Sequence, residues 1–184
     1  ESDGLDPGMA ERIAEELVEE HPENGHYYYL KAFAAMQTTR REEYEVIVGL
    51  LERGNRVKSY YHPYKLYRKR ISKLLEIENL NRFYFGKAFF APTWRIYRDL
   101  CRRCERVILP ELVHGNKEFG KRLAIACERM AERYMGANEG RMYLLVGGAI
   151  AKGMKDVRLK WSADTDSERE KLRRWLAGYR NLMS

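Results

Sequence analysis

The sequence predicts an all-α fold in which antiparallel helical hairpins stack within one domain, residues 1–184, of about seven or eight helices. Apolar residues recur every three to four positions along most of the chain, which is the period of a helix with one buried face. Only five prolines interrupt the 184 residues, and short turns containing glycine or asparagine separate the periodic segments. A chain of this length can bury a core in a single domain.

The N-terminal half, residues 6–78, is expected to hold four helices. Asp6-Pro7 is a cap followed by a proline at the first helical position, and Asn24 is a cap for the second helix. Gly54-Asn55 stands where a left-handed C-cap is typical. The expected helices run over about 7–21, 25–37, 42–53 and 63–78.

The helices expected over 24–37 and 42–53 are joined by a short turn and combine small with aromatic residues, in an arrangement that resembles a tetratricopeptide unit. The matching positions, three in each helix, are Tyr27, Leu30, Ala34, Tyr44, Val48 and Leu51. Lys31 departs from the pattern where a glycine is usual, and Tyr44 departs from it where a small alanine is usual. The resemblance implies tetratricopeptide-like hairpins that stack as an α-α superhelix and bind protein partners. It implies no catalytic residue.

Residues 92–182 are expected to form further helical hairpins after an irregular connector at 79–91. In the connector, consecutive aromatics and Gly86 favour a short strand or a packed loop, and Pro92 then opens a helix. The apolar faces predicted after residue 92 consist of Trp94, Tyr97, Cys101, Cys104 and Ile108; of Phe119, Leu123, Cys127, Met130 and Tyr134; of Val146, Ile150 and Val157; and of Leu172, Trp175, Leu176 and Tyr179. The hairpin at 117–160 is also similar to those of bacterial envelope proteins with tetratricopeptide-like heads.

Two adjacent glycines, Gly147 and Gly148, lie inside an apolar helical segment. Each costs about 1 kcal/mol relative to alanine in a helix interior, so a compensating contact is expected. We predict the close approach of a neighbouring helix or of a bulky aromatic such as Trp161 or Trp175. Contact with a ligand is the alternative interpretation.

The sequence contains no catalytic or metal-binding signature. Cys101 and Cys104 form a CxxC pair, but zinc needs four ligands, and the chain offers neither a second pair nor paired histidines. Both cysteines fall on the expected apolar face, which favours a place in the core. An HExxH motif, a nucleophile elbow and a glycine-rich phosphate loop are all absent from the sequence. We therefore expect a protein that is not an enzyme and carries no cofactor or metal.

The charge is divided unevenly along the chain. Residues 1–54 carry 13 acidic and 5 basic side chains, a net charge of −8, whereas the remainder carries 14 acidic and 29 basic side chains, a net charge of +15. A basic body attracts acidic proteins, nucleic acids and anionic membranes. Solvated helix faces rich in arginine and lysine are the simpler interpretation.

The 13 tyrosines cluster at 27–29 and at 60–67. Three consecutive tyrosines cannot all face one core, because each helical residue turns the chain by about 100°. Tyrosine combines a large contact area with a polar tip, so it suits a binding surface. We predict a non-catalytic protein–protein interaction scaffold that binds an unidentified protein or peptide partner through Tyr28, Phe33, Tyr60, Tyr64 and Arg68.

Two further hypotheses rest on charge. Residues 56–73 interleave bases with tyrosines, a pattern that favours binding of nucleic acid or an anionic surface. The acidic N-terminal part and the basic C-terminal part also predict self-association. The acidic start is not a signal peptide, and no apolar run is long enough to span a membrane. From the missing initiator Met we expect a processed or trimmed chain. A cytoplasmic location and an envelope location with a removed leader or anchor both stay open.

Overall fold

The computed structural model describes residues 7–38, 43–60, 82–136, 141–161 and 163–183. These residues contain no strand, only an isolated β-bridge between Asn24 and Ser59. The helices are α1 (Pro7–Glu20), α2 (Gly25–Ala35), α3 (Tyr44–Arg56), α5 (Arg82–His114), α6 (Lys117–Gly136), α7 (Arg141–Trp161) and α8 (Asp166–Met183). The predicted all-α fold is confirmed. The helix predicted at 63–78 lies outside the described residues.

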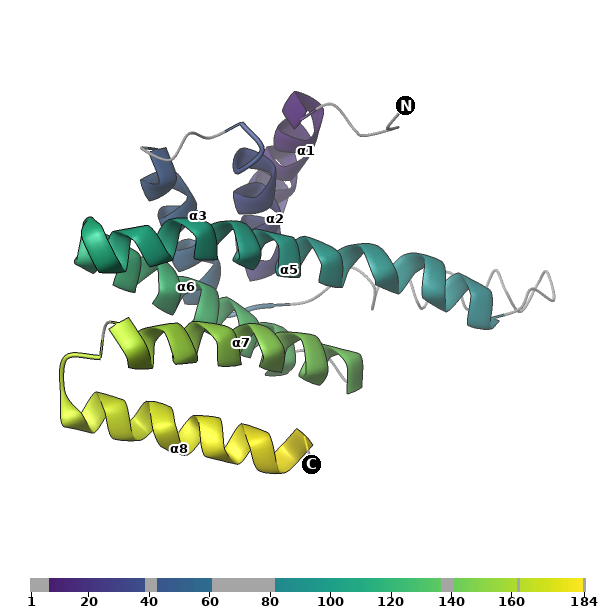
Figure 1. Ribbon diagram of the computed structural model, residues 1–184. Coiled ribbons are helices and arrows are strands. Elements are labelled where there is room, and N and C mark those ends of the chain that lie inside the picture. The colour runs from purple at the N-terminus through teal and green to yellow at the C-terminus, as the bar shows by residue number, and fades with distance from the viewer. Residues whose placement is uncertain (1–6, 39–42, 61–81, 137–140, 162, 184) are drawn as a thin grey trace.

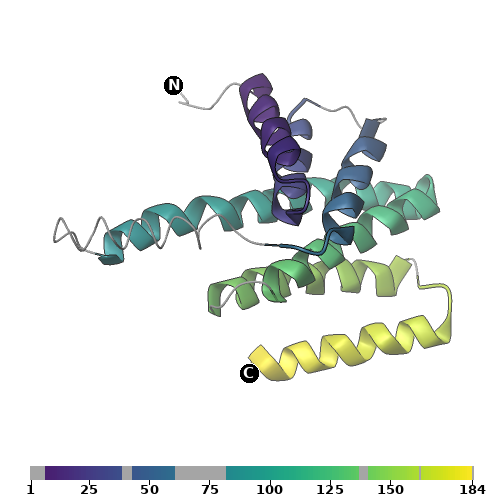
Figure 2. The same ribbon diagram turned by 180° about the vertical axis from the view of Figure 1, so that it is seen from behind.

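Helices α5 to α8 lie side by side in a row, and α1 to α3 cross that row on its α5–α6 side (Figures 1 and 2). α6 is the central helix because it packs against α5, α7 and α3. α8 packs on α7 at the far edge of the row. The hairpin predicted at 117–160 is present as the α6–α7 pair. The stacking of hairpins into a regular superhelix stays a prediction.

The hydrophobic core lies where α5, α6 and α7 meet and continues under α2 and α3. The apolar faces predicted for α5 and α6 point into it. Their buried members are Tyr97, Cys101, Cys104 and Ile108 on α5, and Phe119, Leu123, Cys127, Met130 and Tyr134 on α6. The three- and four-residue spacing therefore identified the buried faces of α5 and α6 correctly.

The course of α5 corrects the prediction of an irregular connector at 79–91. The helix begins at Arg82 and runs without interruption past Gly86, Pro92 and Pro110 to His114. A proline removes one backbone hydrogen bond and a glycine costs about 1 kcal/mol in a helix. Ending the helix would instead leave the backbone groups of several residues without helical partners. The local breaking signals were wrong here because a continuous helix keeps more hydrogen bonds.

The end of α3 also differs from the prediction. Gly54 and Asn55 do not form a left-handed cap, because the helix continues to Arg56. Gly54 is needed for another reason: a Cβ there would lie 2.4 Å from Cε1 of Tyr29 and 3.1 Å from the carbonyl oxygen of Gly25. The missing side chain therefore lets α2 approach α3 closely, with the Tyr29 ring against the α3 backbone.

Polar side chains begin three of the helices. The side chain of Asn24 accepts a hydrogen bond from the backbone N–H of His26 at 3.2 Å, which confirms the predicted cap of α2. Asn116 accepts from the N–H of Phe119 at 3.0 Å, and Thr165 accepts from the N–H of Glu168 at 3.1 Å. Each bond satisfies a backbone donor that the helix itself leaves without a partner.

The glycine pair on α7 makes the close approach that the sequence predicted. A Cβ at Gly147 would lie 2.9 Å from the carbonyl oxygen of Ala131 on α6, and one at Gly148 would lie 2.3 Å from Cε2 of Tyr179 on α8. The aromatic partner is Tyr179, not Trp161 or Trp175. Trp175 stacks on Tyr179, with ring centroids 5.4 Å apart.

Because α2 and α3 approach closely at Gly54, this position leaves no room for a side chain, whereas Gly49 on the same helix does. We expect Gly54→Ala to lower the free energy of unfolding by about 1–3 kcal/mol, because the buried Tyr29 ring has no room to retreat. Urea denaturation followed by circular dichroism measures the change.

Gly49→Ala on the same helix is the matched control. A Cβ at Gly49 meets nothing within 4 Å, so alanine should raise the free energy of unfolding by about 0.5–1 kcal/mol through its higher helix propensity. Equal destabilisation by both substitutions would contradict the packing described for Gly54.

Candidate binding grooves

The structure places the predicted tyrosine surface mostly against the core. Tyr28, Phe33 and Tyr60 are half-buried and pack against core residues. Tyr64 and Arg68 lie outside the described residues. Tyr27 and Tyr29, on either side of Tyr28 in the sequence, are buried, so the three consecutive tyrosines do not all face the core.

The buried tyrosines form an internal polar network. Tyr97 on α5 lies at its centre, with its hydroxyl 2.5 Å from Nδ1 of His26 and 2.8 Å from the hydroxyl of Tyr60. Burial, followed by the neighbouring Tyr60 hydroxyl, raises the pKa of Tyr97, so the phenol stays protonated and can donate. Tyr29 donates to Oδ1 of Asn55 at 2.8 Å. These hydroxyls hold α2, α3 and α5 together, and their residues line neither of the two grooves described below.

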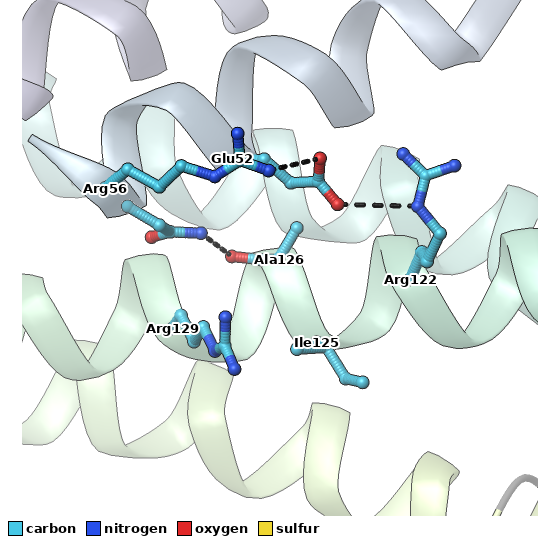
Figure 3. Close-up of a pocket in the computed structure, with 7 residues that line it drawn as sticks. Glu52, Arg56, Arg122, Ile125, Ala126 and Arg129 are labelled. Carbon is cyan, nitrogen blue, oxygen red and sulfur yellow. Dashed lines mark hydrogen bonds and ion pairs between the residues drawn. The ribbon is translucent and has the colours of Figure 1, made fainter.

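An arginine-lined groove lies between α3 and α6 (Figure 3). Its volume is about 280 Å³, and its lining consists of Glu52, Asn55, Arg56, Arg122, Ile125, Ala126 and Arg129. Three of these side chains are cationic and one is anionic. We call this feature the arginine groove.

Ion pairs order one side of the arginine groove. Glu52 lies between Arg56 and Arg122 in a single row, at 3.4 Å from each (Figure 3). Arg122 also reaches Glu45 at 3.3 Å. These carboxylates raise the pKa of Arg122, Glu52 first, so the guanidinium stays charged. Part of the acidic N-terminal region therefore pairs with the basic body within one chain.

Arg129 lies two helical turns beyond Arg122 on α6 and is exposed. Among the described residues it has no hydrogen-bond or ion-pair partner. The groove floor between them is formed by Ile125 and Ala126. Ala126 contributes its carbonyl oxygen to the side chain of Asn55, at 3.0 Å, and this bond fixes the spacing of the two walls. Arg129, exposed beside this row of ion pairs, can therefore bind an anion.

A second groove runs between α5 and α7. It has a volume of about 420 Å³ and a mainly apolar lining of Leu145, Val146, Ala149, Ile150, Gly153 and Met154 on α7, opposite Arg98, Cys101, Arg102 and Glu105 on α5. We call it the α5–α7 groove. The Cys101 thiol forms part of the wall of the α5–α7 groove, whereas no cysteine lines the arginine groove.

A buried ion network joins α6, α7 and α8. Lys155 and Arg158 on α7 both bind the carboxylate of Glu128, and Arg158 also binds Glu168 on α8. Lys155 lies 4.7 Å from the centre of the Trp175 ring as well. Buried charges with this many partners are satisfied structurally, so we assign the network to the attachment of α8. No group of three or more His, Cys, Asp or Glu side chains within the described ranges is arranged to hold a metal ion.

Comparisons with known proteins return no match. No family model matches the chain, and neither a curated protein nor a solved structure is similar to it at a significant level. No described helix is both long and apolar enough to cross a bilayer.

Of the arginines that line the groove, sequence reasoning included only Arg56, as part of the basic segment 56–73. The available signal was the seven-residue spacing of Arg122 and Arg129 around Ile125 and Ala126, which places them on one face of a helix. What the spacing could not supply was the partner helix, because α3 and α6 are separated by about 60 residues of chain.

Because Glu168 belongs to this network, the free energy of unfolding should decrease when Glu168 is protonated at acidic pH. Burial alone would raise the pKa of this carboxyl, but hydrogen bonds from Arg158 and from the N–H of Asp164 outweigh burial and hold it below its usual 4.5. The folded state therefore favours the charged form of Glu168. The stabilisation that this charged carboxylate gives the fold is present above about pH 4.5 and is lost as the pH falls through the pKa of Glu168 in the folded state.

We expect Glu168→Gln to lower the free energy of unfolding at pH 7 by about 1.5 kcal/mol, the lower end for hydrogen bonds to charged groups. The difference from the wild type should shrink as the pH falls below 4.5, as measured by urea denaturation at several pH values. Glu19→Gln, on the exposed face of α1, is the control. A Glu168→Gln deficit that persists unchanged in acid would contradict this assignment.

Proposed function

We propose that the protein is a non-catalytic interaction scaffold that binds an acidic protein segment in the arginine groove. The observation that carries the proposal is the exposed Arg129, which has no partner among the described residues and lies across the groove floor from the ion-paired Arg56 and Arg122. Two or more guanidinium groups around one groove match carboxylates in number and geometry.

The pairs already in the groove support a carboxylate ligand. Arg122 holds Glu45 and Glu52 at 3.3–3.4 Å, longer than the roughly 2.7–2.9 Å typical of strong charge-assisted hydrogen bonds. Arg122 and Glu45 are both largely exposed to solvent, so this ion pair contributes little stability. A partner's carboxylate can therefore replace Glu45 at Arg122 without a large loss.

The floor of the groove suggests how such a segment lies. Ile125 and Ala126 separate Arg122 from Arg129 by about two helical turns, or about 10 Å. A partner with two carboxylates at that separation and a small apolar side chain between them would contact both arginines and the floor. An acidic segment in extended or helical form satisfies this requirement.

A second candidate function is the binding of nucleic acid, which the basic segment 56–73 predicts. One observation favours it: Arg56, the first residue of that segment, lines the arginine groove. The lining contains no aromatic ring, however, and single-stranded nucleic acids bind such surfaces largely by stacking on aromatics. We therefore place the acidic protein segment first.

The proposed function predicts that Arg129→Gln weakens binding of a fluorescein-labelled, glutamate-rich peptide. The expected loss is up to about fivefold in Kd, because an exposed charge pair is worth up to about 1 kcal/mol. Fluorescence anisotropy at low and physiological salt measures it, and affinity should fall as salt rises. The folding stability of the variant should stay unchanged.

Arg173→Gln is the matched control, since Arg173 on α8 is also exposed and without a partner among the described residues. A peptide with glutamine at every glutamate position controls for sequence-independent binding. Equal affinity for the two peptides, or equal losses for Arg129→Gln and Arg173→Gln, would overturn the proposal. Tighter binding of a single-stranded oligonucleotide than of the acidic peptide, weakened by Arg129→Gln, would favour the second candidate.

A further inference from the structure

The α5–α7 groove has one apolar wall and one wall that carries charge. All six of its residues on α7 are apolar, whereas α5 contributes two arginines, Arg98 and Arg102, together with Glu105 and Cys101. Its volume of about 420 Å³ falls within the roughly 300–1,000 Å³ of small-molecule sites, which are mostly apolar with a few polar groups that orient the ligand. The groove therefore matches such a site in size and composition.

The floor of the groove belongs to the hydrophobic core. Cys101, Ile150 and Met154 are buried members of that core and also line the groove. Above them, Ala149 and Gly153 lie one helical turn apart on α7, and a Cβ at Gly153 would meet no atom within 4 Å. The small residues on α7 therefore leave open space above the floor, so a molecule in the groove can contact the core directly.

The charges of the groove are ordered along α5. Because α5 and α7 run in the same direction (Figure 1), Arg98 lies toward the start of the α7 wall and Glu105 toward its end. Arg102 is exposed and has no hydrogen-bond or ion-pair partner among the described residues. Arg98 contacts only partly exposed Asp99 at 3.4 Å, which is a weak pair. An anionic group is therefore favoured beside the two arginines and disfavoured beside Glu105.

We propose that the α5–α7 groove binds a medium-chain fatty acid, with its carboxylate on Arg102 and Arg98 and its alkyl chain along α7. The apolar wall extends from Leu145 to Met154, nine helical steps of about 1.5 Å, or about 13.5 Å, which an extended chain of medium length can follow. Burial of the methylenes supplies affinity, and the arginines fix the direction of the chain. This site is separate from the arginine groove between α3 and α6 and does not depend on the proposed function.

The test is isothermal titration calorimetry of the full chain with hexanoate, octanoate and decanoate, each below its micelle-forming concentration. Each added pair of methylenes should lower Kd by up to about fifteenfold, the value for complete burial. Decanol, which has the same chain without the charge, should bind more weakly than decanoate. Affinity for decanoate should fall as salt rises, because the carboxylate contacts exposed guanidinium groups.

Gly153→Leu fills the groove from α7 and should abolish decanoate binding. The variant should fold at least as stably as the wild type, since its Cβ has room and leucine has the higher helix propensity. Gly178→Leu on α8 is the matched control, because a Cβ there also meets nothing within 4 Å and Gly178 does not line the groove. Urea denaturation followed by circular dichroism establishes that both variants are folded.

Arg102→Gln tests the contact with the carboxylate. It should weaken binding of decanoate by up to about fivefold and leave binding of decanol unchanged, since an exposed charge pair contributes modestly. Arg106→Gln, an exposed arginine one turn further along α5 that does not line the groove, is the control and should change neither affinity.

Four results would overturn the proposal. The first is Gly153→Leu that still binds decanoate, or a loss of the same size in Gly178→Leu. The second is an affinity that does not depend on chain length. The third is decanol bound as tightly as decanoate, or equal effects of Arg102→Gln and Arg106→Gln. The fourth is binding to phosphatidylglycerol vesicles with no binding of decanoate, which would indicate an anionic membrane surface instead of a single fatty acid.

Discussion

The guanidinium of Arg133 on α6 joins the N-terminal helices to the rest of the molecule. It donates to the carbonyl oxygens of Gly54 and Asn55 at 2.6 and 2.9 Å, and to that of Ser59 at 3.0 Å. The carbonyls at the end of a helix have no partner within it, so a cation placed there satisfies them and meets the negative end of the helix dipole. This contact fixes the end of α3 against α6, and the arginine groove lies directly along that junction.

The same junction explains why Tyr29 is buried. Gly54 gives the Tyr29 ring room against α3, and Asn55 accepts the Tyr29 hydroxyl while donating to the carbonyl of Ala126. Asn55 thus connects the tyrosine network to the floor of the arginine groove. Buried tyrosine rings fill the space between helices here, and their hydroxyls bond to other polar side chains. Composition alone does not distinguish this role from recognition of a partner at the surface.

The sequence was informative where one helix determines the outcome. The apolar spacing of α5 and α6, the Asn24 cap and the close approach at Gly148 depend on local period and propensity, and all were predicted. It was misleading where a helix continues through glycine or proline, and where two helices distant in sequence must meet. The helical course of 82–91 and the continuation of α3 through Gly54 override local breaking signals, and the arginine groove requires two helices that are distant in sequence.

The proposed function requires that the α3–α6 junction forms the binding surface. The direct measurement is a titration of the isotope-labelled protein with an acidic peptide, followed by the Nε–Hε NMR signals of its arginines. The largest shifts should fall on Arg129, Arg122 and Arg56, with Arg133 little changed because its donors are already engaged. Shifts centred on the exposed arginines of α5 or α8, with those of the groove unmoved, would contradict it.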